Sequence, residues 1–457
     1  MKTSRHPASF RDPSGFIFVE DGVVYRQINN CYRENYEHLM DSGLYESLSS
    51  QNLIIPHIEV NYAQIESPEA YKVIKPESLS FISYPYEWCF SQLKDAALLT
   101  LHIQRKALEF EMTLKDASAY NVQFWNGKPV FIDSLSFDRY TPGSPWIAYK
   151  QFCQHFLAPL SLMKYRDIRF NQLLKGYLDG IPLDFASSQL PLRTYFRVSL
   201  YSHIHLHAKY QKSFADRTAA LETKKISMIG LLGILDSLES TIKRLEWQIP
   251  DTEWGNYYDN TNYSKDSFDS KKELIDKYLE MVHPRLVFDL GANTGEFSKI
   301  ASRKGIQTIS FDIDPVAVEK NYQNCGRDKE KCILPLILDL TNPSPSLGWA
   351  HEERSSLLKR GPADMLFALA LIHHLAISNN LPFIHIARYF AGLGSYLIIE
   401  FVPKEDSQVQ RLFSTREDIF PDYHQDSFEK AFAMYFNLKE VTEIGGSCRV
   451  LYLMEKI

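Results

Sequence analysis

The sequence predicts an α/β fold with a mostly parallel sheet in its C-terminal part, preceded by an α+β domain. From about residue 251 onward, short apolar runs alternate with helical segments, which is typical of a parallel sheet. Within this part, Val287-Phe-Asp-Leu-Gly-Ala-Asn-Thr-Gly295 reads as a strand, an acid and a glycine turn. Asp312 ends a second apolar run 21 residues after Gly291. This spacing indicates a nucleotide-type cofactor at the carboxyl end of parallel strands.

The composition narrows the class of protein. A length of 457 residues favours two or three domains, and a formal net charge of -6 gives no support to a nucleic-acid or acidic-membrane partner. The six cysteines form no C-x-x-C pair, which predicts a reducing compartment and no zinc site. The N-terminus leads into no apolar signal segment, and the most apolar stretch, 365–377, is short and contains two histidines. We therefore expect a cytoplasmic, multidomain protein without a membrane partner.

The chain divides at two places. Residues 1–212 mix short strands and helices and form the expected α+β domain. Residues 213–250 are expected to form a helical connector, and residues 251–457 the α/β domain. In the connector, apolar residues recur at helical spacing before a terminating proline: Ile234, Leu238, Ile242, Leu245 and Pro250.

The α/β domain is expected to contain five parallel strands and a terminal antiparallel hairpin. The predicted strands lie near 285–289, 307–311, 332–338, 363–369, 395–401, 436–443 and 448–455. The predicted helices lie near 294–303, 315–324, 353–360, 378–391 and 426–435. The last two strands flank Gly445-Gly446 and should pair as a hairpin, which a plain dinucleotide-binding fold lacks.

Two cofactors compete for the glycine turn. A dinucleotide requires G-x-G-x-x-G, so that its pyrophosphate can approach the backbone and the helix N-terminus. Here Asn293 and Glu296 occupy the second and third glycine positions, and Glu296 would repel a pyrophosphate. S-adenosylmethionine (SAM) has no phosphate and carries a sulfonium cation, so the acids are tolerable. The residues therefore favour SAM over NAD.

These segments resemble a known family. Asp289-Leu-Gly-Ala-Asn-Thr-Gly295 is similar to the first motif of class I SAM-dependent methyltransferases, and Phe311-Asp-Ile-Asp-Pro315 to their second. The resemblance covers about 190 residues and implies a Rossmann-like sheet that binds SAM. It implies that Gly291 and Gly295 let the backbone approach the methionine moiety and that Asp312 accepts hydrogen bonds from the ribose. Further cofactor contacts are expected from Asp289, Asn293, Ile313, Asp339, Leu340 and Leu369.

Several of these positions have a structural alternative. Asp339 falls where the family places an acid near the adenine, but it could be a solvated loop acid. Asp314 could contact the cofactor or only cap the helix that begins at Pro315.

Candidate catalytic residues follow the fourth and fifth strands. His373 and His374 could deprotonate an acceptor, with His374 favoured, or could have no catalytic duty. Glu400 is a candidate acceptor-side residue, together with Lys404 and Asp406, although these could equally form a charged surface loop. Phe420–His424 is a further, weaker acceptor-side candidate.

The segment Trp254–Tyr263 is rich in aromatic residues and amides. Aromatic faces stabilise cations by about 0.5–2 kcal/mol, so Tyr258 or Tyr263 could close over the sulfonium as a lid. The alternative is an aromatic plug at the domain junction.

The N-terminal part resembles protein-kinase-like folds. Asp116, Asn121 and Asp133 have the spacing of a catalytic base and two metal ligands, which implies a possible ATP and magnesium site. However, there is no glycine-rich loop, and Arg26 stands in place of the family's lysine. Leu114-Lys115 and Ser134-Leu135 also replace the family's His-Arg and Phe-Gly. We therefore expect a docking or regulatory module rather than an active phosphotransferase.

The whole arrangement resembles the nodulation-protein (NoeA-like) methyltransferases. We expect transfer of a methyl group from SAM to an unidentified acceptor, which could be a small molecule, a glycan or a protein, with O-methylation favoured. Two other classes remain open: an ATP-dependent phosphotransferase that uses Asp116, Asn121 and Asp133, and a non-catalytic binding module.

Overall fold

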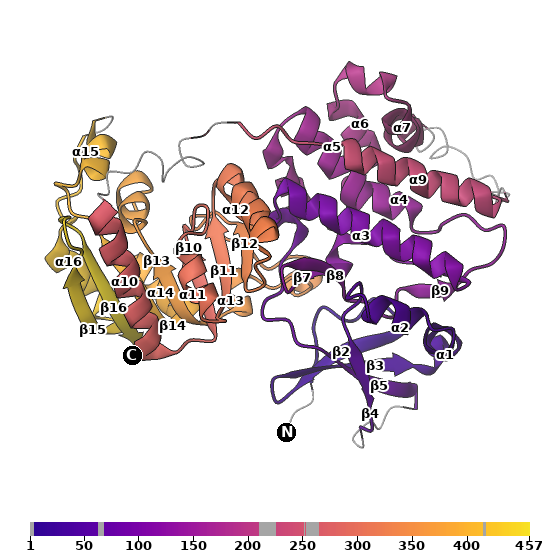
Figure 1. The fold of residues 1–457 in the computed structure, drawn as a ribbon, viewed down its shortest axis with the longest axis horizontal. Helices are drawn as coiled ribbons and strands as arrows, with labels where there is room; N and C mark the ends of the chain where they lie inside the picture. Colours follow the sequence, from indigo (N-terminus) through magenta and orange to yellow (C-terminus); the bar gives the residue numbers. More distant parts are fainter. Residues whose placement is uncertain (1–3, 63–67, 210–224, 251, 253–264, 415–416) are drawn as a thin grey trace. The chain divides into compact units, whose positions relative to one another are not determined.

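The chain folds into two compact units (Figure 1). The computed structural model describes residues 4–62, 68–209, 225–250, 252, 265–414 and 417–457. The first unit contains Met1–Gln248 and, from much later in the sequence, Leu347–Arg354. The second unit contains Ile249–Ser346 and Ser355–Ile457. Among the described helices, none has the length and apolar character needed to cross a membrane.

The first unit begins with an antiparallel sheet in the order β1-β2-β3-β5-β4. Its strands are β1 (Ser4–Arg5), β2 (Gly15–Glu20), β3 (Val23–Asn29), β4 (His57–Val60) and β5 (Ala70–Pro76). The turn between β2 and β3 contains Asp21 and Gly22, both with positive φ, as a tight hairpin requires. Two short helices, α1 (Arg33–Asp41) and α2 (Leu44–Ser49), follow β3 in the chain. Tyr32 and Tyr36 are buried with Ile28 in a core between this sheet and the helices.

The rest of the first unit is mainly helical around α3 (Phe90–Glu109). Its other helices are α4 (Tyr149–Phe152), α5 (Ala158–Tyr165), α6 (Leu183–Gln189), α7 (Val198–Leu200) and α9 (Met228–Arg244). Four short strands pair as β6 (Met112–Leu114) with β9 (Phe137–Arg139) and β7 (Val122–Trp125) with β8 (Lys128–Phe131). Helix α9 lies in the predicted connector and packs on α3, where Arg105 forms an ion pair with Asp236. The structure thus groups residues 225–248 of the connector with the first unit.

The second unit is built on a seven-stranded sheet in the order β12-β11-β10-β13-β14-β16-β15. Its strands are β10 (Leu286–Leu290), β11 (Gln307–Asp312), β12 (Ile333–Ile337), β13 (Ala363–Ala368), β14 (Gly394–Phe401), β15 (Phe436–Glu443) and β16 (Val450–Lys456). The first five pair in parallel, and β16 pairs antiparallel with both β14 and β15. The predicted parallel sheet with a terminal antiparallel hairpin is confirmed.

The helices of the second unit differ from the predicted ones in several places. They are α10 (Lys265–Val282), α11 (Ser298–Arg303), α12 (Pro315–Asp328), α13 (Leu357–Arg360), α14 (Phe383–Leu393), α15 (Ser407–Phe413) and α16 (Gln425–Phe432). Helices α10 and α15 were not predicted. The helix predicted over 353–360 is only α13, because Leu347–Arg354 forms a turn within the first unit. The helix predicted from 378 begins only after Pro382, since proline is poorly accepted in a helix interior.

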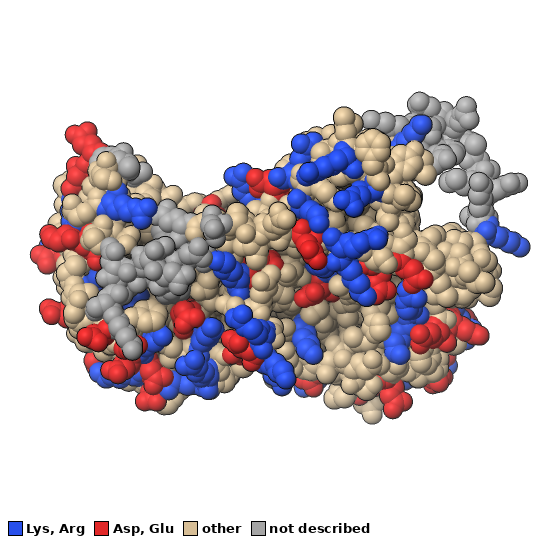
Figure 2. Space-filling view, turned by 45° about the horizontal axis from the view of Figure 1, so that its top comes forward, with Lys and Arg blue, Asp and Glu red and all other residues tan. Residues whose placement is uncertain are grey.

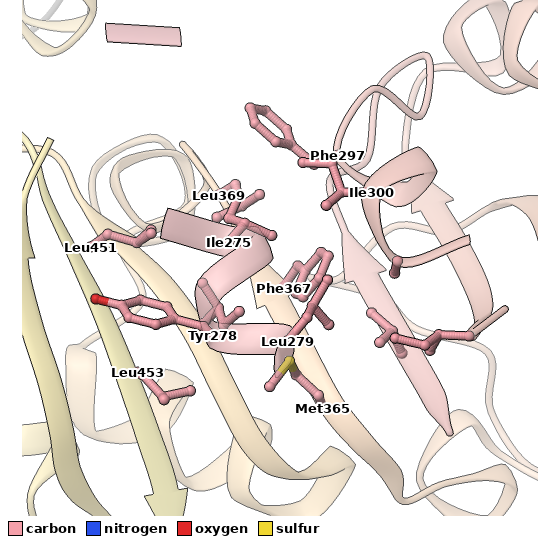
Figure 3. Packing of buried hydrophobic residues seen from close by; sticks show 14 of the residues in the cluster. Ile275, Tyr278, Leu279, Phe297, Ile300, Met365, Phe367, Leu369, Leu451 and Leu453 are labelled. Atoms are coloured by element: carbon pink, nitrogen blue, oxygen red, sulfur yellow. The ribbon is translucent and has the colours of Figure 1, made fainter. Parts of the chain in front are cut away.

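Helix α10 covers the middle of the sheet (Figure 3). Its residues Ile275, Tyr278 and Leu279 are fully buried or nearly so and pack against Met365 and Phe367 of β13. The same apolar cluster reaches β16 through Leu451 and Leu453, and it reaches α11 and its N-cap through Ile300 and Phe297. One stripe of α10 therefore contacts strands from both the parallel part and the hairpin of the sheet.

Candidate functional site

A cavity of about 590 Å³ lies at the carboxyl ends of the parallel strands of the second unit. Many residues predicted to bind the cofactor or to act in catalysis line it: Asp289, Gly291, Asn293, Asp312, Ile313, Asp339, Leu340, Leu369 and His374. They lie at the ends of β10, β11, β12 and β13 or in the loops that follow, so segments that are distant in sequence meet around one space. This is the position at which open parallel sheets bind ligands.

The Asp312 carboxylate joins two of these loops. Its Oδ2 accepts the backbone N–H of Asn293 at 2.7 Å, and its Oδ1 accepts the backbone N–H of Asp314 at 2.8 Å. Burial raises the pKa of Asp312 to about 6, although these hydrogen bonds favour the ionised form. Each carboxylate oxygen has a second lone pair, so the group can still accept hydrogen bonds from hydroxyls in the cavity.

The glycine turn after β10 needs its unusual backbone. Gly291 has a φ of 80°, and its N–H and that of Ala292 both donate to the Phe311 carbonyl oxygen at 2.8 Å. Gly295 also has a positive φ of 84°, but it does not line the cavity. A Cβ at this position would lie 2.6 Å from Oδ1 of Asn321 in α12. Gly295 therefore allows close packing with α12, whereas Gly291 faces the cavity.

Asp289 lines the cavity and is almost completely buried. Its Oδ2 accepts a hydrogen bond from Ser298 Oγ at 2.6 Å, and Ser298 is in turn 2.7 Å from Ser310 Oγ. Burial raises the pKa of Asp289 to about 7, since these hydroxyl contacts only partly replace lost hydration. A positively charged ligand group in the cavity would favour the ionised carboxylate.

Two other acids near the cavity differ in role. Asp339 follows β12 and lines the cavity, and its Oδ1 accepts hydrogen bonds from the backbone and hydroxyl of Thr341. Asp314 is the N-cap of α12: its Oδ1 accepts the Val316 N–H at 2.9 Å, and its Oδ2 accepts from Thr252 Oγ1 at 2.8 Å. The capping alternative for Asp314 is confirmed.

The two histidines after β13 have different surroundings. His374 lines the cavity, and burial lowers its pKa to about 4. His373 is buried and does not line the cavity; its Nδ1 has no hydrogen-bond partner. Burial also lowers the pKa of His373 far below the usual value. Both imidazoles are therefore neutral near pH 7, and only His374 reaches the site.

Glu400 is not exposed to the cavity. Its side chain is 0% exposed, and its Oε2 accepts from Lys271 Nζ at 2.5 Å and from the Ala370 N–H at 2.8 Å. Its Oε1 accepts from Arg449 at 3.1 Å. With both oxygens engaged by buried donors, Glu400 is placed to hold neighbouring segments together. The expectation of an acceptor-facing Glu400 is corrected, because burial beside two cations keeps this carboxylate away from the lining.

The charged loop after β14 also has structural contacts. Asp406 caps α15 through the Gln408 N–H and accepts two hydrogen bonds from Arg449, at 2.7 and 3.0 Å. Lys404 binds Asp418 at 2.7 Å. Tyr423, in the weaker candidate segment, donates to the Val402 carbonyl oxygen. These contacts give all three side chains partners within the fold, and none of the three lines the cavity.

Sequence reasoning missed the contributions of α10 and α15. Lys271 and Phe268 of α10 line the cavity, as do Gln408, Arg411 and Leu412 of α15. Lys271 is 1% exposed, lies 4.3 Å from the centroid of the Phe297 ring, and has a pKa lowered by burial against the opposing effect of Glu400. A signal existed for it: Lys271 occupies the helical stripe that includes Phe268, Ile275 and Tyr278, where an apolar residue is expected.

The proposed lid falls on residues that the structure does not describe. Tyr258 and Tyr263 both lie in the stretch 253–264, outside the described residues. Their role stays a prediction.

The predicted nucleotide residues lie together in the first unit. Asp116 and Asp133 interact electrostatically, and Asn121 hydrogen-bonds to Asp116 and to Ser136 Oγ. However, Arg26 of β3 forms an ion pair with Asp133 at 2.5 Å. Burial alone would raise the pKa of Asp133, but the Arg26 guanidinium and the Leu135 N–H lower it below its usual value. Arg26 thus already supplies the positive charge that a metal would bring to Asp133.

A turn from later in the sequence contacts the same part of the first unit. Glu353 forms an ion pair with Arg11 at 2.6 Å, and the Arg354 guanidinium lies 4.0 Å from the centroid of the Tyr120 ring. Tyr120 is the residue before Asn121. Within the described ranges, no group of three or more His, Cys, Asp and Glu side chains has the arrangement of a metal site.

Comparisons with solved structures gave only weak likenesses. The methyltransferase acting on magnesium protoporphyrin IX (ChlM) from Synechocystis PCC 6803, with bound SAH, is 15% identical with a TM-score of 0.32, covering 45% of this chain and 93% of that one. The bifunctional kinase-methyltransferase WbdD is 15% identical with a TM-score of 0.31, covering 46% of this chain and 43% of that one. With TM-scores this low, neither likeness bears on the function of this chain.

Comparison at the level of sequence is more informative. No family model matches the chain. The nodulation protein NoeA of Rhizobium meliloti (strain 1021) is 34% identical over 468 residues, which cover 100% of this chain and 97% of that protein. The similarity extends through both units rather than one. The chain therefore belongs to the family of nodulation protein NoeA.

Proposed function

We propose that the second unit is a SAM-dependent methyltransferase that binds SAM in the cavity at the carboxyl ends of its strands. The observation that carries the proposal is the Asp312 carboxylate, which two loops fix by backbone N–H groups and which lines a cavity with Asp289 and Asp339. Three acids in one cavity disfavour a pyrophosphate and favour a ligand that carries hydroxyl donors and positive charge. SAM has both, and the residues present fit it.

Each lining segment has a proposed role in holding this ligand. Asp312 accepts hydrogen bonds from the ribose hydroxyls, and Asp339 and Leu340 border the adenine. Gly291 and Asn293 shape the turn beside the methionine moiety, and Asp289 lies beneath it. Leu369 and Ile313 provide apolar contacts. The same arrangement leaves the turn after β13 and helix α15 to contact the acceptor.

The chemistry depends mainly on alignment. When bound, SAM supplies an electrophilic methyl group. The apolar residues of the turn after β13 exclude water around the acceptor, and fixed loops hold it in one orientation. His374 is neutral, so it can take a proton from the acceptor as positive charge develops there. A base with a pKa of about 4 is weak, so alignment of the acceptor with the methyl group contributes more to the rate than proton removal does.

For the first unit we propose a kinase-like docking or regulatory module rather than a phosphotransferase. The grouping of Asp116, Asn121 and Asp133 supports the kinase-like part of this proposal. The ion pair between Arg26 and Asp133 supports the inactive part, because it neutralises the residue that would hold magnesium. A chain that binds neither SAM nor ATP would leave only the non-catalytic alternative.

Replacement of Asp312 by asparagine should weaken SAM binding. A hydrogen bond to a charged acceptor contributes more than a neutral one, so the Kd for SAM should rise roughly tenfold to a hundredfold in isothermal titration calorimetry. Asp364→Asn is a matched control, since Asp364 also accepts two backbone N–H bonds, from Arg285 and Leu286, but does not line the cavity. Equal Kd values for the parent and Asp312→Asn would contradict the assigned role.

The affinity for SAM should rise with pH. Burial raises the pKa of Asp312 to about 6 and that of Asp289 to about 7. Between the ordinary value near 4 and these values, the folded protein binds more protons than the unfolded chain, so their contribution to the free energy of unfolding falls as pH rises. SAM favours the ionised carboxylates, so its Kd should decrease from about pH 5.5 to about pH 7.5, and less so in Asp312→Asn. A Kd that does not change with pH would exclude a part for these carboxyls.

Methyl transfer should depend on His374. Incubation of the purified protein with methyl-labelled SAM and an extract of the native cell should yield a labelled product that mass spectrometry can identify. In His374→Gln the rate of labelling should fall about a hundredfold, as expected for loss of a general base, with an unchanged Kd for SAM. His385→Gln, an exposed position on α14, is the control. Measured SAM binding without any labelled product would oppose the catalytic proposal.

The first unit should not transfer phosphate. With labelled ATP, magnesium and the same extract, the parent protein and Asp133→Asn should give equal background labelling. Asp138→Asn is the control, because Asp138 is a half-exposed acid of β9, five residues later in the chain. Labelling by the parent that Asp133→Asn abolishes and Asp138→Asn retains would show that the first unit is an active phosphotransferase.

A further inference from the structure

The first unit exposes large apolar side chains on a short segment around α7. Leu192, Phe196 and Val198 are 80%, 87% and 83% exposed. Tyr195 and Tyr201 of the same segment are 43% and 41% exposed. Single exposed apolar residues are common, but several highly exposed apolar side chains within seven positions are unusual. We call this segment, residues 192–201, the α7 face.

The α7 face is held in shape from within. Thr194 is buried, and its Oγ1 donates to the Pro191 carbonyl oxygen at 2.7 Å and lies 2.9 Å from His205 Nε2. The other ring nitrogen of His205 lies 2.8 Å from Ser187 Oγ, and the ring stacks on Tyr195 with centroids 3.7 Å apart. Leu200 packs inward and is 2% exposed. The outward apolar side chains are therefore presented by a fixed backbone.

Positive charge surrounds these apolar side chains. Arg193 and Arg197 are exposed between them. Burial is the largest cause that lowers the pKa of Lys164, and the nearby charges of Arg197 and Arg193 lower it further. Glu246 acts in the opposite direction and raises this pKa. The Arg193 guanidinium and the Lys164 ammonium lie 5.4 and 5.7 Å from the centroid of the Tyr165 ring. Figure 2 shows Lys and Arg side chains gathered on the first unit over the region of α5 and α6.

The segment is also free of acids. Residues 185–215 contain no Asp or Glu, although the whole chain has a net charge of -6. The segment itself therefore carries a positive charge, although Glu246 acts on the neighbouring Lys164. Apolar side chains interleaved with arginines match the boundary of an anionic lipid layer, where apolar groups enter the acyl region and cations meet the headgroups. We propose that the α7 face binds the surface of an anionic membrane as a peripheral contact.

This proposal goes beyond the methyltransferase site and does not depend on it. A protein partner would need a matching acidic and apolar surface, whereas a lipid layer supplies both features without a specific shape. The fixed backbone and the alternation of Leu192, Arg193, Phe196, Arg197 and Val198 favour the lipid layer.

The test uses the full chain and sedimentation with lipid vesicles. Vesicles that contain about a third of anionic phosphatidylglycerol should carry the parent protein down, and vesicles of phosphatidylcholine alone should not; raising the salt concentration should weaken binding. The triple variant Leu192→Ser/Phe196→Ser/Val198→Ser and the double variant Arg193→Glu/Arg197→Glu should each lower the partition coefficient by at least about tenfold. Circular dichroism should show that both remain folded, since all five side chains are exposed.

Matched controls change the same chemistry elsewhere. Ile147, Ile229 and Ile419 are 74%, 84% and 63% exposed, and their triple replacement by serine should leave binding unchanged. Arg285→Glu/Arg327→Glu should also leave it unchanged, because these two side chains are 95% and 74% exposed and lie outside the α7 face. Three results would overturn the proposal: no binding to anionic vesicles, equal loss in the controls, or self-association through the α7 face without vesicle binding, which would identify a protein interface.

Discussion

The second unit depends on one buried carboxylate, that of Glu400. A fully buried charge is costly unless it is paired and hydrogen-bonded, and removing one partner of such a pair costs about 3–5 kcal/mol. Glu400 on β14 has two cationic partners, Lys271 from α10 and Arg449 from the entry to β16, and it accepts the N–H of Ala370 in the turn after β13. Four segments that border or support the cavity are thus fixed by one side chain. Ala370 has a φ of 49°, a conformation that non-glycine residues seldom adopt without such support.

This arrangement explains which parts of the site the sequence could predict. Asp289, Gly291 and Asp312 belong to strand-turn-helix units whose geometry is local, so their place at the cavity follows from spacing alone. The parallel sheet with its terminal hairpin was also accessible, because alternating strands and helices allow few topologies. Asp314 could be assigned to a cap because a short side chain followed by proline is a local signal.

The remaining residues depend on contacts that spacing does not encode. Lys271 and Glu400 are 129 residues apart, and no local sequence pattern around either residue indicates that the two form a pair. Helix α15 was missed because Asp406, which caps it, was interpreted as an acceptor-side residue in a loop. In the first unit, Asp116 and Asp133 are close enough to interact electrostatically, whereas the ion pair of Asp133 with Arg26 required the fold of β3. Local motifs therefore located the part of the cavity at the ends of β10 and β11 better than the part that α10 and α15 line.

The turn Leu347–Arg354 limits how the two units could be exchanged by recombination during evolution. This turn belongs to the first unit, whereas the residues on both sides of it belong to the second unit. A single cut in the chain therefore cannot separate the two units. Recombination at the 248–249 border would leave the 7%-exposed Glu353 without Arg11 and would remove Arg354 from Tyr120. Domains that are joined by a simple linker can be exchanged through a single stretch of the gene. Here the exchange of one unit would have to replace two stretches of the gene at once. The two units are therefore expected to descend together.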